Sequence, residues 1–292
     1  MVYSRKQYET SDGSNYYYLS SRFIYDLTDT GRELVEKKVA HELSKLEFVF
    51  DFSVVVVGVT NSGYEMVLRR DDQERILDYD DVIEKWTSIF TPPDPVERYT
   101  RDACDPGEDY DTAVSLIESW HLRLSDYSWL AKVFNQRIGA SFNTYYSRKG
   151  RAWQGRFDSK LLLDLFAVSF CVASICQRSN VRPTESKGGA QYILLDSVAE
   201  VISRDFGCPL SDLLEFFEWA CVGHNAENTT LLKRLGIAGK KARVVIPHFP
   251  DLFAKYVGET NKMRSHCKES NLRWVKGVGC HSELVESSIL PS

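Results

Sequence analysis

The sequence predicts an α+β fold, in which an antiparallel sheet carries helices on one face and a helical region follows. Three observations favour this class. Segments rich in β-formers alternate with helical patterns in the first part of the chain, four consecutive valines mark a buried strand, and the later part has helical patterns only. The chain has 292 residues, of which 43% are hydrophobic, so it can bury a sizeable core.

The N-terminal part begins with a strand, a helix and a hairpin. Residues 16–24 are rich in β-formers and are expected to form the first strand. Residues 33–48 place apolar side chains three and four positions apart, as in a helix with one buried face. Residues 52–59 contain the four valines, which is typical of a central strand. A turn signal at residues 60–63 leads to a second hairpin strand over residues 64–69.

The middle of the chain is expected to be mainly helical. Residues 80–90 indicate a short helix, after which an acidic loop is expected to run to Asp111. An apolar stripe predicts one long helix over residues 112–142. A fourth strand follows, and Asp164 can cap a helix over residues 165–177. This order of strands and helices fits a ferredoxin-like antiparallel sheet.

A glycine-rich stretch at residues 186–189 divides the chain. We expect an α+β domain over residues 1–185, a helical C-terminal domain over residues 190–285 and a loose tail over residues 286–292. Four helical patterns lie in the second domain, over residues 195–204, 210–222, 228–235 and 249–257.

Composition favours a cytoplasmic protein without a membrane partner. The first residues lack the apolar segment of a signal peptide, and the longest apolar run is far below the roughly 20 residues that span a bilayer. The seven cysteines are scattered and include no Cys-x-x-Cys pair, so neither a disulfide framework nor a zinc finger is expected.

Two basic segments stand out in a chain whose net charge is −5. The first, over residues 145–160, suits nucleic acid, because cations bind phosphates and its aromatic rings can stack on bases. The second, over residues 262–276, is expected to add phosphate contacts. In the alternative interpretation, Trp153 and Phe157 pack in the core and the cations are only solvated. The residues expected to contact nucleic acid are Arg148, Lys149, Arg151, Trp153, Arg156 and Lys160 in the first segment, and Lys262, Arg264, Arg273 and Lys276 in the second.

The first basic segment contains Trp153-Gln154-Gly155-Arg156-Phe157, followed by Ser159-Lys160. This element resembles one in single-tyrosine HUH transposases, which include the REP-associated tyrosine transposases. Residues 59–69 and 126–135 resemble two further stretches of that family. The C-terminal part resembles the helical extension of a longer subgroup, so the resemblance covers roughly residues 16–280.

The resemblance implies an active site that is degenerate in this chain. Family members hold a divalent metal with two histidines, two positions apart on one strand, and attack a DNA phosphate with a helix tyrosine. The histidine positions fall on Gly63 and Glu65, which share one face of a strand, and the tyrosine position falls on Ser174. Glycine supplies no ligand, and a serine hydroxyl is a much weaker acid than a phenol. No metal or other cofactor is therefore expected.

The resemblance thus implies a DNA-binding protein that has lost strand cleavage. Its expected partner is hairpin or single-stranded DNA, and the family makes a homodimer plausible. One alternative is an active DNA-strand transferase that uses Mg²⁺ or Mn²⁺ and a displaced tyrosine, Tyr145, Tyr146 or Tyr192. Another is a protein-interaction module, or the product of a decayed element without a role.

Overall fold

A computed structural model gives the fold and describes residues 15–70, 77–104, 107–179, 195–222, 227–253 and 255–271. Several expectations fall outside these ranges: the domain boundary at residues 186–189, the tail at residues 286–292, Tyr192, Arg273 and Lys276.

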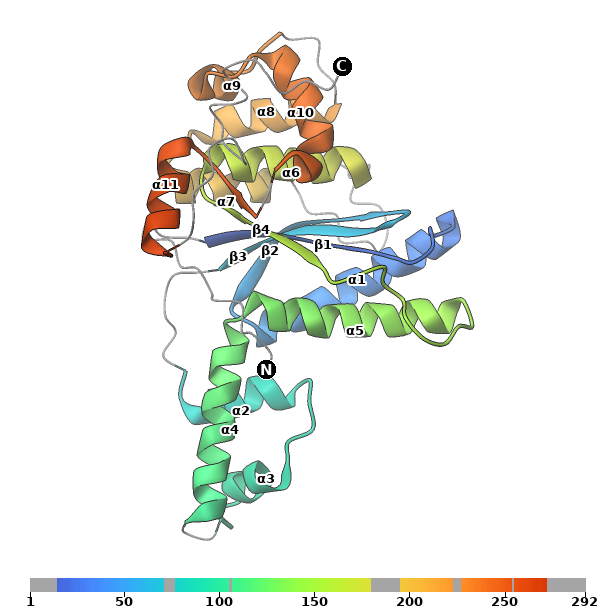
Figure 1. The fold of residues 1–292 in the computed structure, drawn as a ribbon, viewed down its shortest axis with the longest axis vertical. Coiled ribbons are helices and arrows are strands. Elements are labelled where there is room, and N and C mark those ends of the chain that lie inside the picture. Colours follow the sequence, from blue (N-terminus) through green and yellow to red (C-terminus); the bar gives the residue numbers. More distant parts are fainter. Residues whose placement is uncertain are drawn as a thin grey trace.

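A five-stranded sheet with the order β2-β3-β1-β4-β5 lies at the centre of the molecule (Figure 1). The first four strands pair in antiparallel fashion, whereas β5 pairs with β4 in parallel. The α+β class is therefore confirmed, and the sheet is mixed rather than purely antiparallel. The strands are β1 (Asn15–Arg22), β2 (Phe52–Thr60), β3 (Gly63–Arg70), β4 (Asp158–Leu162) and β5 (Tyr256–Val257).

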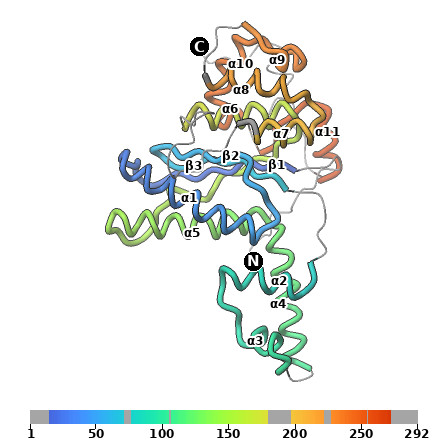
Figure 2. The backbone as a smooth tube through the Cα atoms, turned by 180° about the vertical axis from the view of Figure 1, so that it is seen from behind, coloured from blue at the N-terminus to red at the C-terminus, as the bar shows by residue number. Residues whose placement is uncertain are grey.

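Helices cover both faces of the sheet, so the expectation of helices on one face is wrong (Figure 1). One face packs on α1 and α5, and beyond them α2, α3 and α4 project away from the sheet in both views (Figure 2). The other face packs on α6, against which α7, α8 and α10 lie. The helices of the described ranges are α1 (Asp29–Val49), α2 (Tyr79–Thr87), α3 (Asp94–Thr100), α4 (Glu108–Leu124), α5 (Tyr127–Tyr145), α6 (Leu165–Ser179), α7 (Leu195–Phe206), α8 (Leu210–Val222), α9 (Thr230–Leu235), α10 (Gly239–Leu252) and α11 (Thr260–Glu269).

The helix α6 explains why the second face is covered. Its residues from Phe166 to Cys176 are all buried, so the helix is covered all round and needs partners on two sides. It rests on the sheet on one side and on α8 and α10 on the other, and all of them share one hydrophobic cluster. Asp164 caps the helix as predicted, because its Oδ1 accepts from the Ala167 N–H at 2.9 Å.

Three predicted segments, two helices and one loop, differ from the structure. The long helix over residues 112–142 is two helices, α4 and α5, because the Asp126 side chain accepts from the Ser128 N–H and starts a new helix. The acidic loop contains α3. The helix expected over residues 249–257 corresponds to α10. It begins ten residues earlier than predicted, at Gly239, and ends at Leu252.

Replacing Glu42 by glutamine is expected to lower the free energy of unfolding by about 1–2 kcal/mol at neutral pH. This buried α1 carboxylate contacts Lys38 Nζ at 2.6 Å and Arg137 Nη1, on α5, at 2.8 Å. Burial acts to raise the pKa of Glu42, but the two cations outweigh it and hold the pKa below its ordinary value. The stabilisation is therefore present above the unfolded-state pKa and is lost as the pH falls through the lower folded-state pKa.

Urea denaturation of both proteins at neutral pH and in acid measures this effect. The difference between wild type and Glu42→Gln should shrink in acid, whereas Glu33→Gln, at an exposed position of the same helix, should change little. A difference that persists unchanged in acid would mean that the ion pairs are not its cause.

Candidate functional site

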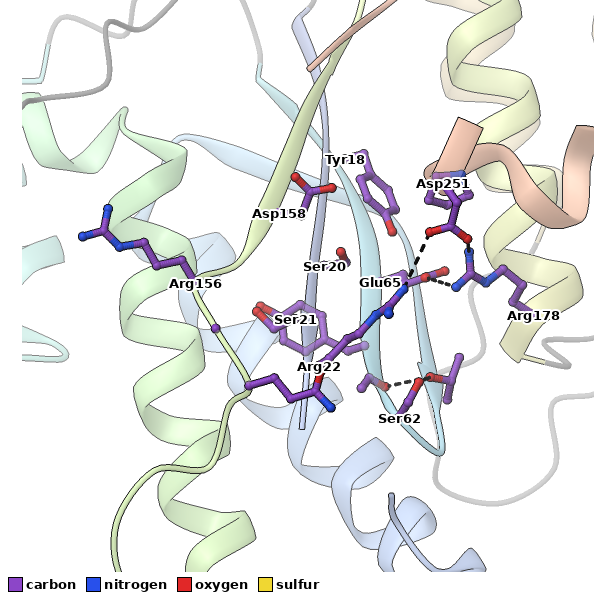
Figure 3. A pocket seen from close by; sticks show the side chains of 16 residues that line it. Tyr18, Ser20, Ser21, Arg22, Ser62, Glu65, Arg156, Asp158, Arg178 and Asp251 are labelled. Atoms are coloured by element: carbon purple, nitrogen blue, oxygen red, sulfur yellow. Dashed lines mark hydrogen bonds and ion pairs between the residues drawn. The ribbon is translucent and has the colours of Figure 1, made fainter. Parts of the chain in front are cut away.

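A pocket with a volume of about 400 Å³ opens beside the hairpin end of the sheet, on the face that α6 covers (Figure 3). The strands β1 and β3, the segment before β4, and the ends of α6 and α10 all contribute to it. The side chains labelled in Figure 3 are Tyr18, Ser20, Ser21, Arg22, Ser62, Glu65, Arg156, Asp158, Arg178 and Asp251.

Strand register explains why polar side chains gather there. Ser20 on β1 lies opposite Glu65 on β3 and opposite Asp158 on β4, so these three residues form one row across the sheet. Arg22 lies opposite Gly63 in the next row. Gly63 and Glu65 lie two residues apart on β3, as predicted, and both line the pocket. Further along β1, this face becomes apolar and joins the core under α6.

Glu65 and Arg178 form the innermost charged pair of the pocket. Arg178 Nη2, from the last turn of α6, lies 2.9 Å from Glu65 Oε1. The Glu65 side chain is only 10% exposed, and this burial raises the pKa of its carboxyl, while the Arg178 guanidinium acts in the opposite direction. Position 65 is one of the two where the resemblance places a metal ligand. Its carboxylate is already paired with the Arg178 guanidinium of the protein itself.

Gly63 lies where β1 and β3 approach too closely for any side chain. A Cβ atom at this position would lie 2.0 Å from the Ser21 carbonyl oxygen and 3.0 Å from Arg22 Cα. Both are backbone atoms, which cannot move aside without shifting the strand. In this backbone, position 63 therefore has no room for a histidine or any other metal ligand.

Ser174 lies on α6 one turn before Arg178 but is fully buried, and it is not among the residues that line the pocket. Its Oγ has no hydrogen-bond partner, neither a base nor an acceptor. The tyrosine whose hydroxyl does point into the pocket is Tyr18 on β1 (Figure 3). Burial raises the pKa of Tyr18 above its ordinary value, and the nearby Glu65 carboxylate adds to the shift.

Trp153 anchors the segment before β4 to the core instead of presenting its ring to solvent. The ring stacks on Phe23 with 4.4 Å between centroids, and Nε1 donates to the Asn135 carbonyl of α5 at 2.9 Å. This is the packing role that the alternative interpretation assigned to it. The anchor holds the next residues, Gln154 to Arg156, at the rim of the pocket.

The structure separates the other predicted cations. Arg156 lines the pocket, while Lys149 and Arg151 are exposed on the turn after α5. Arg148 lies over the Tyr25 ring at 4.0 Å. Lys160 is buried, and its Nζ donates to Asp158 Oδ2 at 2.8 Å. Lys262 and Arg264 are exposed on α11, beyond the β5 edge of the sheet.

Sequence reasoning missed three charged residues of the pocket, Arg22, Arg178 and Asp251. Arg22 could have been found from strand periodicity, because it lies four residues after Tyr18 on the same face of β1. Arg178 and Asp251 reach the pocket through the packing of α6 and α10, and no local pattern in the sequence indicates that packing.

The described residues contain no group of three or more His, Cys, Asp or Glu side chains arranged to hold a metal ion. In the same ranges, no helix is long and apolar enough to cross a bilayer. No protein-family model matches this sequence, and neither a curated protein nor a solved structure matches it. Function therefore has to be inferred from the geometry of the pocket.

Proposed function

We propose that this protein binds hairpin or single-stranded DNA and is a relative of the single-tyrosine HUH transposases that no longer cleaves strands. One observation carries the proposal. The hairpin positions Gly63 and Glu65, the segment from Gln154 to Arg156, and the last turn of α6 line a single pocket, although they lie far apart in the sequence. The resemblance expects positions 63, 65 and 174 at one site; Gly63 and Glu65 line this pocket, whereas Ser174 is buried one turn before Arg178 on α6.

The sheet supports the finer expectation about the fold. The order β2-β3-β1-β4, with α1 and α5 together on one face, supports a ferredoxin-like core. The helices from α7 to α10 share the cluster under the other face, and they are the counterpart we propose for the helical extension of the longer subgroup.

Loss of cleavage follows from the chemistry that remains in the pocket. Metal-assisted attack on a phosphate needs ligands on a hard cation and an accessible nucleophile. Gly63 cannot carry a ligand in this backbone, Glu65 is paired with Arg178, and Ser174 is buried. Binding needs none of these groups, because phosphates are attracted by arginines at the pocket rim.

The test of binding is fluorescence anisotropy with labelled hairpin and single-stranded DNA over a range of salt concentrations. The double variant Arg151→Ala with Arg156→Ala should weaken binding roughly tenfold and reduce the salt slope by about 1.4, since each lost phosphate contact on a single strand is worth about 0.7. Trp153 is unsuitable for this test because its loss would disturb the core.

The matched control is Lys37→Ala with Lys45→Ala. Both lysines are exposed on α1, on the opposite side of the sheet, and their removal changes the net charge equally. Equal losses of DNA affinity in the two double variants would mean that binding depends only on the net charge of the protein. Absence of DNA binding in the wild type would refute the proposed function.

An active strand transferase is the second candidate, and one observation favours it: the Tyr18 hydroxyl points into the pocket beside Glu65 (Figure 3). Tyr145 and Tyr146 lie at the end of α5 and do not line this pocket. This function requires a covalent protein–DNA adduct in the presence of Mg²⁺ or Mn²⁺ that Tyr18→Phe abolishes. Denaturing gel electrophoresis detects such an adduct, and its absence rejects the candidate.

A further inference from the structure

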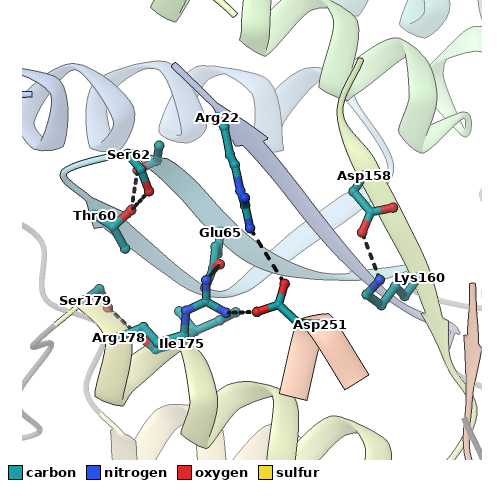
Figure 4. A network of polar contacts seen from close by, with 11 residues as sticks. Arg22, Thr60, Ser62, Glu65, Asp158, Lys160, Ile175, Arg178, Ser179 and Asp251 are labelled. Atoms are coloured by element: carbon teal, nitrogen blue, oxygen red, sulfur yellow. Dashed lines mark hydrogen bonds and ion pairs between the residues drawn. The ribbon is translucent and has the colours of Figure 1, made fainter. Parts of the chain in front are cut away.

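Asp251 lies between two arginines at the mouth of the pocket (Figure 4). Its Oδ1 is 3.6 Å from Arg22 Nη2, and its Oδ2 is 3.9 Å from Arg178 Nη1. The three residues come from the end of β1, the end of α6 and the last turn of α10. One carboxylate of the C-terminal region thus bridges two guanidinium groups of the first part of the chain.

Both contacts are weak. Each distance exceeds the 3.5 Å limit of a hydrogen bond, and the side chains of Asp251 and Arg22 are 59% and 62% exposed. Ion pairs of this kind contribute little to stability. By contrast, the Glu65–Arg178 pair is close and largely buried, so it fixes that guanidinium in place while its Nη1 has no hydrogen-bond partner.

The Asp251 side chain can move without its backbone. The neighbouring Phe249 and Pro250 are buried and hold the last turn of α10 in the core, whereas the Asp251 side chain is 59% exposed. Its carboxylate can leave the two arginines without the loss of a strong contact.

We propose that Asp251 occupies an anion subsite, where a phosphate group binds between Arg22 and Arg178 once this carboxylate has moved away. A phosphate oxygen pair can accept from two guanidinium groups in the same way as a carboxylate, with more negative charge. That the phosphate belongs to a nucleic acid strand rests on the proposed function; the subsite itself rests on the ion pairs. Asp251 then acts as an internal competitor that weakens binding by the wild-type protein.

The charges around the subsite agree with this assignment. Asp158 is paired with Lys160, and Glu65 is paired with Arg178 (Figure 4). Departure of Asp251 therefore removes the carboxylate that opposes Arg22. The exposed Arg156 lies at the same pocket and adds a further positive charge.

The test uses the full chain with Asp251→Asn and measures two probes, inorganic phosphate by isothermal titration calorimetry and labelled single-stranded DNA by fluorescence anisotropy. Asp251→Asn should bind phosphate roughly three- to tenfold more tightly than the wild type, because one or two weak ion pairs no longer compete. Adding Arg22→Gln should cancel the gain. Arg22→Gln alone should weaken phosphate binding, which provides a second readout if Asp251→Asn folds poorly.

Asp102→Asn is the matched control. Asp102 is exposed, does not line this pocket and has a φ of 51°, a conformation that asparagine tolerates well. It removes one negative charge and should leave both affinities unchanged. If Asp251→Asn raises the affinity for phosphate no more than Asp102→Asn does, the anion subsite is refuted, even if the wild type binds DNA.

The two probes separate the remaining outcomes. If Asp251→Asn binds both phosphate and DNA more tightly than the wild type, the subsite and its assignment to nucleic acid are supported. A gain for phosphate alone, while DNA binds unchanged, supports the subsite and refutes its assignment to the DNA strand. A gain for phosphate in a protein that binds no DNA supports the subsite and refutes the proposed function.

Discussion

Replacing Asp205 by alanine is expected to lower the free energy of unfolding by about 3–5 kcal/mol, because it removes a buried carboxylate that contacts both Arg69 and Tyr16. Asp205, on α7, pairs with Arg69 of β3 through Nε and also through Nη2 at 3.1 Å. It also accepts from the Tyr16 hydroxyl at 2.6 Å. The side chains of Asp205 and Arg69 are only 5% and 12% exposed, so water replaces the lost partner poorly.

Urea denaturation followed by circular dichroism measures this loss. The neighbouring Arg204 is the control, because it contacts the same carboxylate at 3.5 Å from an exposed position. Arg204→Ala should cost less than about 1 kcal/mol. A similarly small cost for Asp205→Ala would mean that α7 is held on the sheet by its apolar contacts alone, through Val198, Ala199 and Ile202.

The four antiparallel strands and several helices could be predicted from the sequence because their signals are local. Alternation in β3 and the valine run in β2 identify strands whatever they pack against. The cap of α6 was found for the same reason, since Asp164 and the Ala167 N–H that it binds are three residues apart. The strand β5 was missed because its two residues are too short to show any period.

At two places the sequence carries competing local signals. The apolar stripe runs on through residues 112–142, and it hid the cap at Asp126 that separates α4 from α5. Prolines usually end helices, so a helix that contains Pro247 and Pro250 was not expected over the range of α10. In both places the pattern that is more prominent in the sequence is not the one that decides the structure.

Part of the pocket was not predictable from local patterns. Positions 63 and 65 could be placed two residues apart on one strand because the hairpin signal is local. The partner of Glu65 could not be identified, since Arg178 lies more than a hundred residues away and reaches it only through the packing of α6 on the sheet. Nor could the sequence reveal that the β1 backbone occupies the space beside Gly63.

Replacing Gly63 by alanine is expected to cost about 3 kcal/mol of unfolding free energy, at the upper end of the range for overpacking, because the new Cβ would meet the Ser21 carbonyl at 2.0 Å. Gly155→Ala is the control within the same pocket. A Cβ at position 155 meets nothing within 4 Å, so this change should lie within about 0.5 kcal/mol of the wild type. Urea denaturation compares the two variants.

Gly63→His extends the test to the question of whether position 63 can hold a metal ligand. The imidazole needs the same Cβ, so this variant should lose at least as much stability as Gly63→Ala, and Mn²⁺ should not restore it. If the histidine variant instead folds well and Mn²⁺ raises its melting temperature, β1 can move aside and Glu65 can exchange Arg178 for a metal ion. The expected result means that the pairing of β1 with β3 excludes a metal ligand at position 63. A single substitution would then not create a metal site there, because the backbone itself fills the place of the ligand.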